Sequence, residues 1–269
     1  MPVTSRRFPN AKFAALLALL AGVLNATVIR TPPAEFRATY SLSPAGRVIL
    51  QNLYGDVEIT AWDRDEVQVL ATRHSPSSAL LNDSLLNDAR VVVETSAGLV
   101  SIHTLYTGAA SARPASVDYR IKVPRGANLE NIRLVNGGLS LSGLSGPVKA
   151  SSVNGSIRAE KLAGEVELST INGRLDAEFQ QLTRTHAISL RSVNGPIRLS
   201  LPEGAAATIF ARNLSGGIQS EFARSWRTPE GHRLDADLHG GGARIHLQNV
   251  NGGISIHSSW PRPPLSPTS

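Results

Sequence analysis

The stretch that decides the fold runs from Val135 to Leu175 and reads VNGGLSLSGLSGPVKASSVNGSIRAEKLAGEVELSTINGRL. In it an aliphatic residue, a small residue and a glycine recur every nine residues. The copies are Val135-Asn136-Gly137, Leu144-Ser145-Gly146, Val153-Asn154-Gly155, Leu162-Ala163-Gly164 and Ile171-Asn172-Gly173. Asn-Gly copies alternate with Ser-Gly or Ala-Gly copies, so the repeating unit has 18 residues.

Alternating aliphatic residues follow each glycine, as in Ile157/Ala159 and Leu175/Ala177. This period of two predicts short strands with one buried face. Asn-Gly also suits two-residue hairpins, but a meander has no reason to repeat side-chain identity at every second strand. We therefore predict an all-β, single-stranded β-solenoid with coils of about 18 residues, in which Ile157, Leu175 and Ile197 are stacked neighbours.

The same three-residue frame returns later in the chain, and the outward positions agree with stacking. The later copies are Val193-Asn194-Gly195, Leu214-Ser215-Gly216 and Val250-Asn251-Gly252. In-register stacking would align Arg158 with Asp176 and Arg198, and Lys149 with Glu167. Charges alternate in sign along both columns, as is favourable for closely stacked side chains.

The sequence from residue 27 to residue 126 predicts an irregular N-terminal β region that caps the first coil. Its expected strands are Arg47–Leu50, Val57–Ala61, Val67–Thr72, Arg90–Thr95, Leu99–Thr104 and Val117–Val123. Ser77–Asp88 suits a short helix or a loop, and Tyr106–Pro114 a loop. The predicted organisation is a signal peptide at 1–26, the cap region at 27–126, solenoid repeats at 127–257 and a disordered Pro-rich tail at 258–269.

The N-terminal segment has the pattern of a secretory signal. Arg6, Arg7 and Lys12 precede an apolar run from Phe13 to Leu24, and the small residue Ala26 follows. The run is shorter than the roughly 20 residues that a membrane span needs. We expect cleavage after Ala26 and an exported protein, periplasmic or at the cell surface. An uncleaved N-terminal anchor is the alternative.

Composition excludes several classes of protein. The chain has no Cys, which excludes a disulfide scaffold, a thiolate zinc site and an iron–sulfur cluster. The formal net charge of +6 reflects a small surplus of basic residues without a basic stripe, so nucleic-acid binding is not expected.

Two glycine-rich patterns suggest chemistry and lack the residues that it requires. Nine-residue glycine repeats that bind calcium carry an Asp after the glycines, and this chain has none there. We expect the repeat asparagines to bond backbone groups at the corners. His239-Gly240-Gly241-Gly242 resembles an esterase oxyanion loop, but no Gly-x-Ser-x-Gly partner exists, so we predict a turn that leads into the strand at Ile245.

Three groups of side chains remain as candidates, and for each a solvated surface or flank packing is the favoured interpretation. A metal cluster could be drawn from Asp235, Asp237, His239, His246 and His257. An acid pair for glycan cleavage could be drawn from Glu165, Glu167, Asp176 and Glu178. Trp226, in the insertion at 222–226, is a candidate contact residue.

Three further segments carry a family resemblance. They are Asn52-Leu53-Tyr54-Gly55-Asp56-Val57-Glu58-Ile59 with Trp62-Asp63, Tyr119-Arg120-Ile121-Lys122-Val123-Pro124-Arg125-Gly126, and the Val/Ile-Asn-Gly blocks. Over roughly 45–257 the chain resembles a family of bacterial exported proteins known as putative adhesins, a domain of unknown function. The resemblance implies a β-solenoid-like fold, export, and a surface or periplasmic role.

The sequence therefore predicts a non-catalytic, exported binding module, an adhesin-like protein whose partner is an envelope polymer or protein. No catalytic, cofactor-binding or metal-ligating residue is predicted. The alternatives are an envelope-associated sensor or regulatory partner and, less favoured, a glycan-cleaving enzyme.

Overall fold

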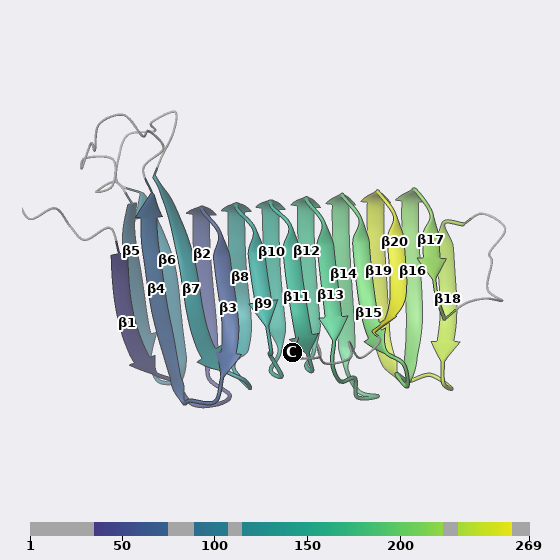
Figure 1. The fold of residues 1–269 in the computed structure, drawn as a ribbon, viewed down its shortest axis with the longest axis horizontal. Helices are drawn as coiled ribbons and strands as arrows, with labels where there is room; N and C mark the ends of the chain where they lie inside the picture. The colour runs from purple at the N-terminus through teal and green to yellow at the C-terminus, as the bar shows by residue number, and fades with distance from the viewer. Residues whose placement is uncertain (1–34, 75–88, 107–114, 223–230, 260–269) are drawn as a thin grey trace, which may run out of the picture. The chain divides into compact units, whose positions relative to one another are not determined.

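The computed structural model describes residues 35–74, 89–106, 115–222 and 231–259, which all belong to one unit, Pro32–Ser269. Their strands form two ten-stranded sheets (Figure 1). The first sheet contains, in spatial order, β1 (Glu35–Ser41), β4 (Glu66–His74), β7 (Ser116–Pro124), β3 (Val57–Trp62), β9 (Leu139–Ser142), β11 (Ile157–Leu162), β13 (Leu175–Phe179), β15 (Ile197–Pro202), β20 (Ile254–Ser259) and β17 (Ile218–Ser220). The second contains β18 (Arg233–Leu238), β16 (Ala207–Ser215), β19 (Ala243–Asn251), β14 (Ala187–Asn194), β12 (Val166–Asn172), β10 (Val148–Asn154), β8 (Asn128–Asn136), β2 (Arg47–Tyr54), β6 (Leu99–Tyr106) and β5 (Ala89–Ser96).

The central strands of both sheets are parallel, and they are in register apart from irregularities in β8 and near the end of β11. In the first sheet Ile157 pairs with Leu175, and Leu175 pairs with Ile197, which confirms the predicted neighbours. All three are fully buried or nearly so, in one hydrophobic core that both sheets share. Burial of each such aliphatic side chain contributes about 1.5–3 kcal/mol, so this core is the main source of stability in a chain without disulfides.

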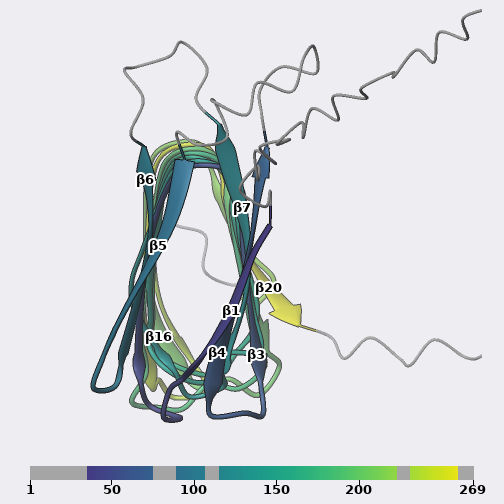
Figure 2. The same cartoon turned by 90° about the vertical axis from the view of Figure 1, so that its left-hand side faces the viewer.

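The predicted single-stranded β-solenoid is wrong. The strands make two separate, mixed sheets that face each other across the core, as in a β-sandwich, and they do not close into a solenoid (Figure 2). The spacing of the repeat correctly identifies which strands are neighbours. It says nothing of pairs in which at least one strand lies outside the repeat, and β1–β4, β4–β7, β5–β6 and β16–β18 all pair antiparallel.

The last strands along the chain are not the last in space. β19 lies between β14 and β16, and β20 lies between β15 and β17 (Figure 1). The copy of the frame at Val250 is thereby inserted between the copies at Val193 and Leu214. Because of this insertion, Asn251 lies beside Asn194, so two Asn-Gly copies are neighbours. The Ser-Gly copy that begins at Leu214 lies nearer the end of the sheet.

The six strands expected between residues 47 and 123 are all present, as β2 to β7. The segment expected as a short helix or loop, residues 77–88, lies outside the described residues, as do the predicted signal peptide, residues 107–114 and residues 260–269. Among the residues that the structure describes, no helix is long and apolar enough to cross a membrane.

A buried polar network joins the two sheets near their N-terminal strands. The amide of Asn52 donates to the carbonyl oxygens of Gly55 (3.1 Å) and Val117 (2.9 Å). Its Oδ1 accepts from the Thr104 hydroxyl at 3.1 Å, and that hydroxyl lies 2.7 Å from the hydroxyl of Tyr119. Burial raises the pKa of Tyr119 to about 12. The residues of this network are buried, so the loss of one partner leaves the others unpaired.

We expect stability to fall as the pH rises from about 10 to 12. Unfolded tyrosine ionises near pH 10, whereas folded Tyr119 keeps its proton until about 12, so the unfolded state binds fewer protons in this range. The contribution of Tyr119 to this loss is about 2 kcal/mol at pH 12. Denaturant unfolding of the wild type and Tyr119→Phe at pH 8, 10 and 11.5 measures it, and parallel pH profiles of the two proteins would refute it.

Candidate functional site

The outer face of the second sheet carries exposed aliphatic side chains next to the Asn-Gly turns. Residues alternate along β10, so Ser152 points inward and Val153 outward. The register of neighbouring strands aligns the equivalent residues in one row. This row, called the aliphatic column, consists of Leu53, Val135, Val153, Ile171, Val193, Val250 and Leu214.

The aliphatic column is long and accessible. Six of its members are 36–75% exposed, and Val135 is half-buried. Seven strands at a spacing of about 4.8 Å give it a length of roughly 29 Å. Leu144 and Leu162, which hold the same place in the copies at Ser145-Gly146 and Ala163-Gly164, are buried instead. The same sequence frame thus supplies core side chains at Leu144 and Leu162 and the exposed side chains of the aliphatic column at the Asn-Gly turns.

Polar side chains take the inward positions beside the aliphatic column. Thr170 donates to the carbonyl oxygen of Gly155 at 2.9 Å, and Ser192 to that of Gly195 at 3.2 Å. The amides of Asn249 and Asn213 donate to the carbonyl oxygens of Gly195 (3.0 Å) and Gly252 (2.6 Å). These bonds satisfy carbonyl groups at the turns, which explains why polar residues point inward there.

The repeat asparagines were predicted to bond backbone groups, and Asn136 does so, because its amide donates to the carbonyl oxygen of Leu53 at 3.4 Å. The others form a ladder of side chains along the turns. The amide of Asn154 donates to Oδ1 of Asn136 at 2.9 Å, and the amide of Asn172 to Oδ1 of Asn154 at 2.8 Å. Asn194 and Asn251 extend the ladder with 2.9 Å bonds. Their amide groups already bond one another, so the ladder is an uncharged border of the aliphatic column.

A groove runs along the other border of the aliphatic column. It has a volume of about 450 Å³, with Val153, Ile171, Val193 and Val250 on one wall. The opposite wall belongs to the next outward row, called the arginine row. The arginine row consists of Gln51, Arg133, Ser151, Ser169, Arg191, Gln248 and Arg212. It holds three cations and no carboxylate.

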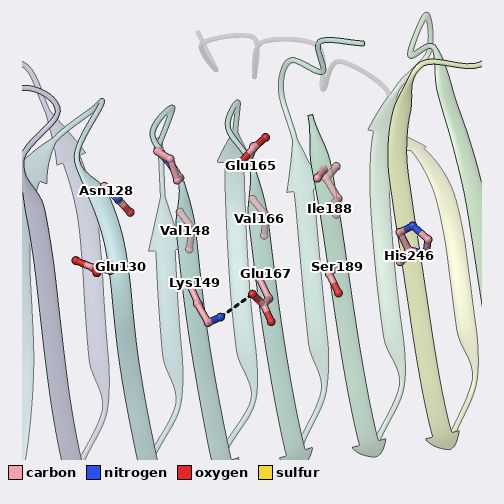
Figure 3. Close-up of a pocket in the computed structure, with 12 residues that line it drawn as sticks. Asn128, Glu130, Val148, Lys149, Glu165, Val166, Glu167, Ile188, Ser189 and His246 are labelled. Carbon is pink, nitrogen blue, oxygen red and sulfur yellow. Dashed lines mark ion pairs between the residues drawn. The ribbon is translucent and has the colours of Figure 1, made fainter. Parts of the chain in front are cut away.

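A second depression, of about 390 Å³, lies nearer the start of the same strands (Figure 3). Lys149 and Glu167 form an ion pair across it at 2.9 Å, which confirms their predicted column. Glu167 also lies 3.7 Å from Arg191 of the arginine row. Both contacts are solvent-exposed and contribute little to stability, at most about 1 kcal/mol each. This depression has charges of both signs, in contrast to the groove.

We expect substitutions at the exposed and the buried aliphatic positions of the frame to lower the free energy of unfolding by very different amounts. Ile171→Thr keeps a β-branched side chain at a position that is 45% exposed, so the free energy of unfolding should fall by less than about 1 kcal/mol. Leu162→Thr places a hydroxyl in the core and should cost at least about 3 kcal/mol. Urea unfolding measures both, and equal costs would contradict the exposed position of Ile171.

The four candidate acids are divided between the two sheets. Glu167 belongs to β12 of the second sheet, and Asp176 and Glu178 belong to β13 of the first, on outward faces of different sheets. Glu165 and Glu167 line the second depression. These two acids lie two residues apart in one stretch of chain and do not face each other across the depression, which disfavours the glycan-cleaving hypothesis.

The candidate metal residues are also separated. His246 stacks on Phe210 in the second sheet, with ring centroids 5.1 Å apart, while His257 of the first sheet bonds Glu221 at 3.0 Å. Asp237 accepts from Thr208 at 2.7 Å. No group of metal-ligating side chains is found in residues 35–74, 89–106, 115–222 and 231–259.

His239-Gly240-Gly241-Gly242 forms the predicted turn, between β18 and β19. The His239 ring lies 3.0 Å from the carbonyl oxygen of Ala205, so the side chain holds the turn against a neighbouring loop. Trp226 lies outside the described residues. The aliphatic column itself was missed, although the alternation in Val148, Ala150 and Ser152, carried one residue further, places Val153 outward.

Comparisons with known proteins relate the fold to solved structures. No protein-family model matches the sequence, and no curated protein matches it. A crystal structure of a "putative cell adhesion protein" from Clostridium sporogenes aligns with a TM-score of 0.50 and 11% identity, over 84% of this chain and 100% of that one. A "putative adhesin" from Bacteroides fragilis aligns with a TM-score of 0.36 and 11% identity, over 85% of this chain and 98% of that one. A "putative lipid binding protein" from Parabacteroides distasonis aligns with a TM-score of 0.30 and 11% identity, also over 85% of this chain and 98% of that one.

The Clostridium structure supports a shared fold and, at 11% identity, nothing finer. The two alignments with TM-scores of 0.36 and 0.30 carry no argument about ligand or partner.

Proposed function

We propose that this chain is a non-catalytic, exported binding module and that the aliphatic column is its contact surface. The observation that carries the proposal is the retention of an aliphatic residue at a position that the fold leaves open to solvent. Six exposed members lie in one continuous row, whereas scattered single exposed aliphatics would need no explanation. Contiguous apolar rows with polar borders are typical of interaction sites.

Two further observations support the proposal. The N-terminal pattern of Arg6, Arg7, Lys12 and the apolar run to Leu24 predicts export. The Clostridium neighbour is named as a putative cell adhesion protein, a role that requires a surface rather than a catalytic cleft. The partner would be a component of the cell envelope.

Binding to an isolated envelope fraction tests the proposal. The double variant Ile171→Thr/Val193→Thr removes apolar character from the centre of the aliphatic column and preserves β-branching. We expect it to bind at least about tenfold more weakly than the wild type. The matched control is Arg158→Gln/Arg198→Gln, on the outer face of the first sheet, which should bind as the wild type does. Equal binding by all three proteins would refute the assigned surface.

Export has a separate test. Fractionation of the producing cell, with N-terminal sequencing of the protein, should find it outside the cytoplasm and beginning after Ala26. A protein that remains in the cytoplasm with its first residues intact would contradict export.

A further inference from the structure

We infer that the partner of the aliphatic column is an anionic lipid surface, with the column in contact with the apolar boundary and the arginine row in contact with the headgroups. The inference rests on the proposed function, because it names the partner of the same face. It follows from the order of side chains across the strand ends: cationic row, apolar row, uncharged ladder.

The apolar part of the face has the form that an interfacial contact requires. Ile171 (45% exposed), Val193 (38%) and Leu214 (75%) belong to one straight row on a rigid sheet, and none is an aromatic residue that would stack on a sugar ring. Amphipathic helices with a basic polar face bind at the boundary of headgroups and acyl chains, and this face presents the same combination of apolar and basic side chains.

The charges beside the apolar row supply that border. Arg133, Arg191 and Arg212 are exposed and lie in one row with Ser and Gln residues. Arg174, also exposed, follows the ladder residue Asn172 and adds a cation at the turn. Each Lys or Arg near an anionic bilayer strengthens binding, and salt weakens that contribution.

The acidic groups of the same face define which half of it would touch the lipid. Glu130, Glu165 and Glu167 line the second depression, nearer the start of the strands (Figure 3). Glu167 is paired with Lys149 at 2.9 Å, and Glu130 with Arg47 at 3.3 Å. Glu167 lies 3.7 Å from Arg191 and partly compensates the positive charge of that guanidinium. The contact is therefore assigned to the turn half of the second sheet, and the depression with Lys149 is expected to remain in water.

A peptide partner fits this face less well. In the central strands each backbone edge already pairs with a neighbour, as β12 does with β10 and β14, so the face offers no strand edge for another chain. The groove can hold side chains only. The surface of an anionic bilayer, which offers both charged headgroups and an apolar boundary, matches this face better than an extended peptide does.

Vesicle co-sedimentation of the full chain tests the inference. Vesicles of phosphatidylcholine with about 30% phosphatidylglycerol are compared with vesicles of phosphatidylcholine alone, in low and high salt. We expect the wild type to bind the anionic vesicles at least about tenfold more tightly, and high salt to weaken that binding. Ile171→Thr/Val193→Thr and Arg133→Gln/Arg191→Gln/Arg212→Gln should each lower it about tenfold or more, while Arg158→Gln/Arg198→Gln leaves it within about twofold.

The outcomes separate this inference from the proposed function. Because every protein compared has the same N-terminal segment, vesicle binding that both variants retain would arise elsewhere and would overturn the inference. Absence of vesicle binding by the wild type would also overturn it, and the proposed function would survive if envelope capture still depends on Ile171 and Val193. A self-association that the same double variant abolishes, without vesicle binding, would replace the lipid with a second copy of the chain. Far-UV circular dichroism and unfolding curves establish that each variant is folded.

Discussion

Gly155→Ala should destabilise the protein by about 3 kcal/mol or more, because a Cβ atom at this position would lie 1.8 Å from the carbonyl oxygen of Gly137 on the neighbouring strand. That oxygen belongs to the backbone and cannot rotate away. The same approach recurs at Gly195, where a Cβ atom would lie 2.1 Å from the carbonyl oxygen of Gly173. The stacked turns thus require glycine for close approach, which gives the Asn-Gly repeat its physical basis.

The matched control is Gly204→Ala. Gly204 lies in the loop after β15, and a Cβ atom there would meet nothing within 4 Å. We expect its free energy of unfolding to change by no more than about 0.5 kcal/mol. Urea unfolding of both variants makes the comparison, and a Gly155→Ala protein as stable as Gly204→Ala would show that the turns are not closely stacked.

Asn52→Ala should lower the free energy of unfolding by about 3 kcal/mol. Asn52 is 2% exposed, and its amide bonds the carbonyl oxygens of Gly55 and Val117 while its Oδ1 accepts from Thr104. Alanine leaves these buried groups without their partner, and each unsatisfied group costs about 1–3 kcal/mol. Thermal unfolding monitored by circular dichroism, together with urea unfolding, measures the loss.

Asn172→Ala provides the contrast, since Asn172 is an exposed member of the asparagine ladder. It donates to Asn154 and accepts from Asn194, and water can replace both bonds. The expected cost is about 1 kcal/mol or less. If Asn52→Ala were no more destabilising than Asn172→Ala, the buried network would not be a structural requirement.

The strands and their lateral neighbours could be predicted from the sequence. Period-two alternation located β11, β13 and β15, and the repeat of 18 residues placed Ile157, Leu175 and Ile197 side by side. Both signals are local or periodic, so one sequence contains them. The ion pair of Lys149 with Glu167 followed from the same register.

The relation of the two sheets and the order of the last strands could not be predicted. The copy of the frame at Val250 resembles the copies at Val153 and Val193, and nothing local says that it lies between Val193 and Leu214. The antiparallel pairs at the sheet ends join segments without a repeat, such as β1 and β4. Such pairings depend on contacts distant in sequence, and side-chain periodicity does not encode them.

The candidate surface was missed for a different reason. The frame has an aliphatic residue at both kinds of turn, but the structure buries Leu144 and Leu162 and leaves Val153 and Ile171 exposed. Two corners with the same residue pattern differ because the polar residue before Val153 or Ile171 is needed inside, where Ser152 and Thr170 reach carbonyl groups of the turns. Hydrophobicity alone does not distinguish them.

A fluorescence measurement tests most directly whether the aliphatic column contacts an apolar boundary outside the protein. The chain has no Cys, so a single Ile171→Cys variant can carry one environment-sensitive fluorophore, and Ser140→Cys on the outer face of the first sheet can carry the same probe. Added anionic vesicles should shift the emission of the probe at residue 171 to shorter wavelength and leave the probe at residue 140 unchanged. An unchanged probe at residue 171, or an equal shift at both positions, would contradict the claim.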